Sequence, residues 1–344
     1  MRLRTLFTTG AVALGVLATA GAPSAVADQS PTAQLRVTIG APRAQAHPTT
    51  AGAGVVATCS INKITINRFS ECEWVAVHVD VVKVVDGAPV IEGTADFSVK
   101  HQMTLKASSA NWSEQFTISK ATTTGQGKGV SVEVAAVSGG GTKAGVHFAQ
   151  GHTLDSAASG SVDYTTGAIA RKKINPKAKT TYTYTFTKAG YTPGTVSYAS
   201  AVYRCDNYYG TTGCAITEAP TGINLSTLPR IAEGIRKLRS RGGHYGDPGS
   251  GGKPLHWMIN AAQQKKNRQA VCSGTAPADM RRAGRTSCDE YPFASTYEGG
   301  THLPAAQRTI TWVKKSENDG QGAYITNWRR QFHVMDHDPF YVIA

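Results

Sequence analysis

Residues 287–300 read SCDEYPFASTYEGG, and this stretch decides how the C-terminal part of the 344-residue chain is interpreted. Two adjacent carboxylates, Asp289 and Glu290, follow Cys288 directly, and Glu298 precedes a Gly-Gly pair. The neighbouring sequence is rich in Lys and Arg. Acids inside a basic segment are typical of metal-assisted phosphodiesterases, because a carboxylate must deprotonate water or hold a cation while nearby cations hold the phosphates. The alternative is a solvated acidic turn pinned by a disulfide.

Three arginines lie just ahead of these acids: Arg281, Arg282 and Arg285. A guanidinium group pairs bidentately with phosphate oxygens, so we expect them to contact the phosphates that flank the scissile bond. The alternative is that they only neutralise Asp289 and Glu290.

The block from Cys288 to Ala294, together with Glu298 and the two glycines after it, resembles the signature of the NucA/NucB family of secreted bacterial deoxyribonucleases. The resemblance runs from about Pro254 to the C-terminus. It implies hydrolysis of DNA phosphodiester bonds by water, with one divalent cation bound to the scissile phosphate. Metal-finger nucleases generally use a histidine as general base, whereas this family has an aspartate there, and Asp289 stands at the matching position.

The predicted general base requires surroundings that raise its pKa, because an aspartate at its reference pKa of about 3.9 is a weak base. Apolar neighbours such as Tyr291 and Phe293 would raise the pKa of Asp289 by desolvation, whereas nearby arginines would lower it. Glu290 and Glu298 complete the predicted catalytic set. A histidine base is the main alternative, and the candidates are His302, His333 and His337.

The resemblance also implies oxygen ligands for the metal. Asn318 comes first, because it is expected just ahead of a helix, where such nucleases place an Asn or His ligand. Asn327, Glu290 and Glu298 follow. These ligands suit magnesium, manganese or calcium with retained waters. Asn318 could instead cap the helix. The stretch DGQG at 319–322 is interpreted as a Gly-rich turn that puts one more acid beside the ligand.

Residues 220–344 are expected to form a small α+β nuclease domain. Apolar residues at helical spacing predict helices at 226–239 and at about 255–267. A strand at 308–313, a turn, a helix from about 322 to 332 and a last buried strand follow. Acidic turn, strand, loop with an Asn and then helix is the chain order of a ββα-metal nuclease, the broader group that the NucA/NucB family resembles.

The N-terminal part of the sequence has a different pattern from residues 220–344. Residues 1–27 have the charged start, apolar run and small-x-small cleavage site of a secretory signal. Residues 28–54 are interpreted as a flexible leader. Across 55–219, alternating runs such as 74–81 and 180–186 predict short strands between Gly-rich turns, and hence an antiparallel β-sandwich-like domain. The predicted fold class of the chain is therefore α+β. The β-rich domain either binds envelope polymer, carbohydrate or nucleic acid, or has only a structural role.

The composition indicates what kind of partner the protein binds and where it works. A formal charge of +13 and a pI near 9.5 favour a polyanion. No stretch after the signal approaches transmembrane length. Six cysteines in three sequence-local couples predict three disulfides of an exported protein: Cys59–Cys72, Cys205–Cys214 and Cys272–Cys288. We therefore expect a secreted, extracellular monomer that binds DNA and no membrane.

Together these features predict a secreted, metal-dependent and largely sequence-nonspecific DNA endonuclease. One alternative is a secreted protein that holds DNA or an envelope polymer without cleaving it. Another is a glycosidase that uses Glu290 and Glu298 as its carboxylate pair.

Overall fold

The computed structural model describes residues 32–40, 43–46 and 59–344. The predicted signal and most of the predicted leader lie outside these residues. The leader prediction is wrong for two segments, because β1 (Ala33–Ile39) and β2 (Arg43–Ala46) are strands. β1 pairs antiparallel with β4 over its whole length, and its alternating Leu35, Val37 and Ile39 give it the pattern of a half-buried strand.

The β-rich part is built on one large sheet, which has 13 strands within the described residues. The strand order is β10-β8-β12-β13-β1-β4-β5-β6-β11-β9, with β3 on β4, β2 on β3 and β7 on β5. Besides β1 and β2, the strands are β3 (Lys63–Ile66), β4 (Ser70–Val85), β5 (Ala88–Lys106), β6 (Ser109–Ile118), β7 (Thr122–Gly125), β8 (Ser131–Ser138), β9 (Thr142–His147), β10 (His152–Thr153), β11 (Ala158–Thr166), β12 (Thr180–Lys188) and β13 (Tyr191–Ala199).

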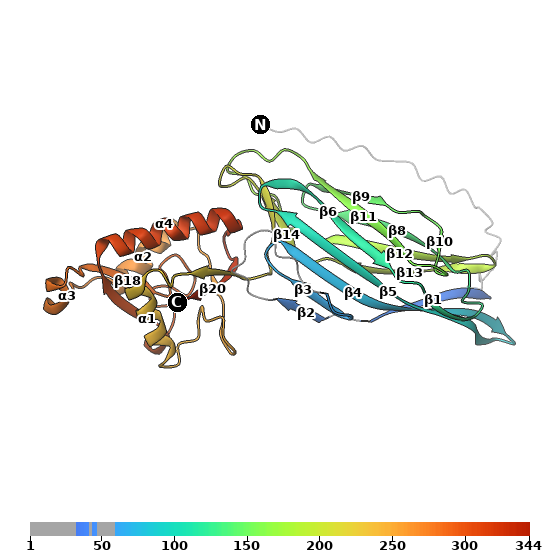
Figure 1. The fold of residues 1–344 in the computed structure, drawn as a ribbon, viewed down its shortest axis with the longest axis horizontal. Coiled ribbons are helices and arrows are strands. Elements are labelled where there is room, and N and C mark those ends of the chain that lie inside the picture. Colours follow the sequence, from blue (N-terminus) through green and yellow to red (C-terminus); the bar gives the residue numbers. More distant parts are fainter. Residues whose placement is uncertain (1–31, 41–42, 47–58) are drawn as a thin grey trace, which may run out of the picture.

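This sheet is curled. β8 and β9 are separated in the chain only by residues 139–141, yet they stand near opposite ends of the strand order, so the two ends of the sheet meet. The inner face is mostly apolar because alternate residues point inward, as in β4, where Val75, Val77 and Val79 are at most 3% exposed. Figure 1 shows the curled sheet as an elongated body beside the helical part of the chain.

The C-terminal part is smaller and mixed. β16 (Thr221–Asn224), β20 (Pro339–Ile343) and β17 (Leu255–His256) form a three-stranded sheet with β20 in the middle, and β18 (Ser287–Tyr291) pairs antiparallel with β19 (Thr309–Val313). The hairpin of β14 (Tyr203–Asp206) and β15 (Gly213–Ile216) joins the two parts. The helices are α1 (Pro229–Arg239), α2 (Ala261–Val271), α3 (Ala278–Arg282), the 3₁₀ turn η1 (Ala305–Gln307) and α4 (Lys315–Phe332). No helix among the described residues is both long and apolar enough to cross a membrane.

Two predicted helix starts are wrong. α2 begins at Ala261 rather than near residue 255, because Asn260 caps it and β17 pairs with β20. α4 begins at Lys315, so DGQG at 319–322 is helix and not a turn. Packing overrides the low helix propensity of the two glycines. The Glu317 carboxylate in the first turn accepts hydrogen bonds from two backbone amides at the start of α1. All three predicted disulfides are present.

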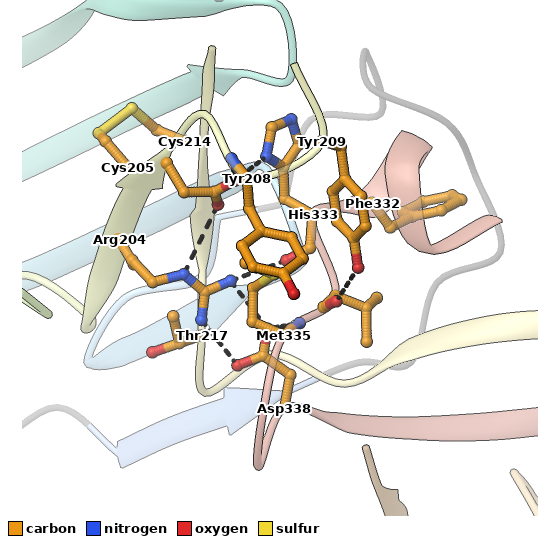
Figure 2. Close-up of polar contacts among 12 residues, drawn as sticks. Arg204, Cys205, Tyr208, Tyr209, Cys214, Thr217, Phe332, His333, Met335 and Asp338 are labelled. Atoms are coloured by element: carbon orange, nitrogen blue, oxygen red, sulfur yellow. Dashed lines mark hydrogen bonds and ion pairs between the residues drawn. A yellow bond between two sulfur atoms is a disulfide. The ribbon is translucent and has the colours of Figure 1, made fainter. Parts of the chain in front are cut away.

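The two parts meet at a buried charge cluster (Figure 2). Arg68 and Arg204 of the β-rich part both donate to the Asp338 carboxylate, with Arg68 Nη2 at 2.6 Å from Oδ2 and Arg204 Nη1 at 3.0 Å from Oδ1. Arg68 Nε also donates to the Phe332 carbonyl at the end of α4, at 2.8 Å. Cations therefore satisfy carbonyls that the helix end leaves free. His333 adds a hydrogen-bond contact, with its Nδ1 at 3.0 Å from Asp206 Oδ1.

Candidate active site

A cleft of about 400 Å³ opens between α2, β18 and α4. β18 contributes Asp289 and Glu290, and α4 contributes Asn318 and Gln321. α2 contributes Arg268, and Lys265 lies one turn earlier on the same helix. The cleft thus combines carboxylates, carboxamides and cations, which are the groups that phosphodiester hydrolysis requires.

The two acids lie on a strand, so the predicted acidic turn is wrong. Successive side chains of a strand point to opposite faces. On one face Cys288 forms the disulfide with Cys272 at the end of α2, and Arg268 Nη1 pairs with Glu290 Oε2 at 3.0 Å. On the other face Asp289 points toward α4. The pairing of β18 with β19 fixes both directions.

Asp289 is only 4% exposed. Its pKa is raised to about 7, mainly by burial and also by the neighbouring Glu290 carboxylate, while the Gln321 carboxamide and the Arg268 guanidinium oppose the rise. Burial also raises the pKa of Glu290, against the opposing charge of Arg268. A carboxylate with a pKa near neutrality is suited to accept a proton from water at physiological pH.

Asn318 lies in the first turn of α4 rather than ahead of the helix, and Lys314 occupies the cap position, so the capping alternative is wrong. Its Nδ2 donates to Ser287 Oγ at 2.8 Å and to the Cys288 carbonyl at 3.1 Å. Both amide hydrogens are therefore engaged by β18. The Oδ1 atom, with no hydrogen bond from the described residues, remains as the free acceptor in the cleft.

Gln321 was not predicted. It lies three residues after Asn318, which places both side chains on the same face of α4. Only 6% of Gln321 is exposed, and its Nε2 has no hydrogen-bond partner among the described residues. The signal for it was the Asn-x-x-Gln spacing, which has meaning only once 315–322 is recognised as helix.

Two predicted residues lie away from the cleft. Asn327 is nine residues, or roughly two and a half helical turns, beyond Asn318. It is therefore on the opposite face of α4, exposed beside Trp328. Glu298 binds His256, with Oε1 at 2.8 Å from Nδ1 and Oε2 accepting from the His256 amide at 2.9 Å. Glu290 and Glu298 do not share a cleft, so the structure gives the glycosidase alternative no support.

The predicted arginines are not in the cleft either. Arg281 and Arg282 are exposed on α3, and Arg281 Nη1 donates to the Ala276 carbonyl at 2.6 Å. Arg285 lines a separate groove beside α1, with Arg230 and Lys237. The cation beside the acids is instead Arg268, which is close in space and not in sequence.

The histidine alternatives are placed elsewhere as well. His302 lines a different pocket with Tyr297. His337 stacks on the Tyr297 ring, with centroids 4.1 Å apart. His333 is buried in the charge cluster between the two parts. Of the candidate bases, only Asp289 lies in the cleft.

The donor set fits a hard divalent cation. Among the described residues, one group of three close potential metal ligands occurs, formed by Cys272, Cys288 and Glu290, but its sulfurs are joined in a disulfide and offer no thiolate. The cleft itself offers oxygens from Asp289, Glu290 and the free Oδ1 of Asn318. Oxygen donors of this kind suit magnesium, manganese or calcium.

Comparison with known proteins agrees with this chemistry. Residues 249–343 match a family described as Deoxyribonuclease NucA/NucB, and this segment contains the whole cleft. No curated protein and no solved structure matches the chain. The C-terminal domain of this protein is therefore a nuclease domain of the NucA/NucB deoxyribonuclease family.

Proposed function

We propose that the protein is a secreted, metal-dependent and largely sequence-nonspecific DNA endonuclease, with Asp289 as its general base. One observation carries the proposal: Asp289 is a buried carboxylate with a pKa raised to about 7, in a cleft that also holds Asn318 and Arg268. In this proposal β18, β19 and α4 form the ββα unit of a metal-finger nuclease. The three disulfides support an extracellular location, because disulfides persist in an oxidising environment.

The chemistry follows from the positions of the side chains. Asp289 takes a proton from water as the water oxygen bonds to phosphorus. The P–O ester bond breaks, its electron pair stays on the leaving oxygen, and that oxygen takes a proton from solvent. Arg268 and Lys265 are positioned to contact phosphate oxygens. Asn318 Oδ1 and the Glu290 carboxylate would hold a divalent cation, which supplies positive charge to the phosphate when bound.

Contacts to the backbone of DNA carry no sequence information, so this set of residues favours cleavage without sequence preference. The net charge of +13 supports capture of a polyanion. We propose residues 220–344 as the nuclease domain, acting as a monomer on DNA without a membrane. Residues 55–219, extended by β1 and β2, are proposed as a β-rich domain that supports it.

The test uses the purified protein with supercoiled plasmid and magnesium, manganese or calcium in separate reactions. We expect relaxed and linear products, complete loss of cleavage with excess chelator, and a loss of about 10²- to 10⁴-fold in rate for Asp289→Asn. Asn327→Ala, on the far face of α4, is the matched control and should cleave like the wild type. Plasmid that stays intact with every cation but is retained in a salt-sensitive complex would favour the non-catalytic alternative.

A further inference from the structure

The buried carboxamide of Gln321 is incompletely bonded in the cleft. The side chain is 94% buried, since 6% is exposed, and its Nε2 reaches no acceptor among the described residues. A buried N–H group without a partner is costly, and such groups are rare in native proteins. The carboxamide lies close enough to the Asp289 carboxylate to lower its pKa, although Nε2 makes no hydrogen bond of normal length and angle with any described residue.

The two groups are complementary to one water molecule. An ionised Asp289 only accepts hydrogen bonds, whereas Gln321 Nε2 only donates them. A water between them donates one hydrogen to Asp289 and accepts one from Nε2, which leaves its second lone pair directed elsewhere. The cleft is polar and, at about 400 Å³, has ample room for such a water.

We infer that Gln321 and Asp289 together hold the attacking water, with Gln321 Nε2 donating to the oxygen that becomes bonded to phosphorus. This inference rests on the proposed function. Asp289 takes the proton and Gln321 is unchanged by the reaction, so the carboxamide acts only by fixing the position of the water oxygen. Holding the nucleophile in an attack geometry is a recognised source of rate. Asn318, one turn earlier, is engaged by β18 and cannot supply this donor.

The test compares wild type with Gln321→Met, Gln321→Glu and Gln321→Asn in plasmid and short-duplex cleavage. Met has nearly the same shape and no donor, Glu cannot donate when ionised, and Asn keeps the amide but is one methylene shorter. We expect kcat to fall about 100-fold for Met and Glu, with KM and DNA affinity in chelator within about twofold of wild type. The Tm of Gln321→Met should be unchanged or higher, because the substitution removes an unsatisfied buried donor. A residue with only a structural role would instead lose Tm and activity together.

A double-mutant cycle with Asp289→Asn decides whether the two residues share one water. Residues that act as a unit give non-additive losses, so the double variant should be no slower than Asp289→Asn alone. Losses that multiply would overturn the inference, because Gln321 would then act at a separate place such as a phosphate oxygen. Full activity in Gln321→Met would overturn it as well. Neither result would contradict the proposed function. That function is contradicted only if the wild type does not cleave DNA or if Asp289→Asn cleaves normally.

Discussion

Asn318 and Asn327 are the same residue type on the same helix, and the structure gives them opposite surroundings. Asn318 is held by β18 with its Oδ1 in the cleft, whereas Asn327 is exposed on the far face. We expect Asn318→Ala to raise the magnesium or manganese concentration needed for half-maximal cleavage by about 10-fold or more. Isothermal titration of the protein with manganese, without DNA, should show the same weakening.

Asn327→Ala provides the control for this pair and should leave both the titration and the cleavage unchanged. Equal effects of the two substitutions would mean that the face of α4 turned to the cleft does not hold the cation.

For single residues, the sequence predicts those site residues that belong to a continuous motif. Asp289 follows from a block of adjacent residues that resembles a family signature, so no distant contact is needed to find it. Gln321 could not be found in that way, because Gly320 and Gly322 made a helical turn look like a loop. Arg268 was missed because a disulfide and a strand, and not the order of the chain, bring it to Glu290.

Strands β4 and β6 carry acids into the interior of the curled sheet. Glu71 and Glu73 of β4 are at most 3% exposed, and Glu73 Oε1 has no hydrogen-bond partner among the described residues. Burial and the nearby Glu114 of β6 raise the pKa of Glu71 to about 8 and that of Glu73 to about 9. Both groups are therefore protonated in the folded protein at neutral pH.

The pKa of Glu73 is higher in the folded than in the unfolded chain, so the folded state binds more protons and stability falls as pH rises from about 4.3 through 9. We predict that Tm decreases between pH 7 and pH 9, and that Glu73→Gln flattens this decrease, as measured by differential scanning calorimetry. Glu133→Gln on the exposed side of β8 is the control and should follow the wild-type curve. A Glu73→Gln curve parallel to wild type would show that this acid is already ionised in the folded state.

The elements of the sheet were partly predictable. The alternating runs at 74–81 and 180–186 correctly predicted strands within β4 and β12, since a period of two is a local property. The pairing of β1 with β4 and the curl that joins β8 to β9 depend on contacts between distant segments, which the pattern of one strand does not encode.

In the whole molecule, the β-rich part and the nuclease domain share the charge cluster around Asp338 (Figure 2). Arg68, Arg204 and Asp338 are nearly or fully buried, so their charges depend on one another. Removing one partner of a buried ion pair costs about 3–5 kcal/mol. We predict that Asp338→Asn lowers Tm by about 10 °C and lowers nuclease activity at 37 °C, as measured by calorimetry and plasmid cleavage.

Asp336→Asn, two residues away on a more exposed carboxylate, should change Tm by much less. A wild-type Tm in Asp338→Asn would mean that the cluster does not couple the two parts. The sequence did not indicate this cluster, because Arg68 and Asp338 are 270 positions apart and Arg68 lies outside the segment that matches the nuclease family.

The late position of β20 in the chain determines when the three-stranded sheet can be completed during synthesis. β20 lies between β16 and β17, and every residue that lines the cleft precedes it in the chain. A nascent polypeptide that has emerged from the ribosome as far as Ile325 thus carries the complete set of cleft residues but lacks the middle strand of this sheet. Because domains generally fold as units, we expect the cleft to assemble only after β20 has been synthesised.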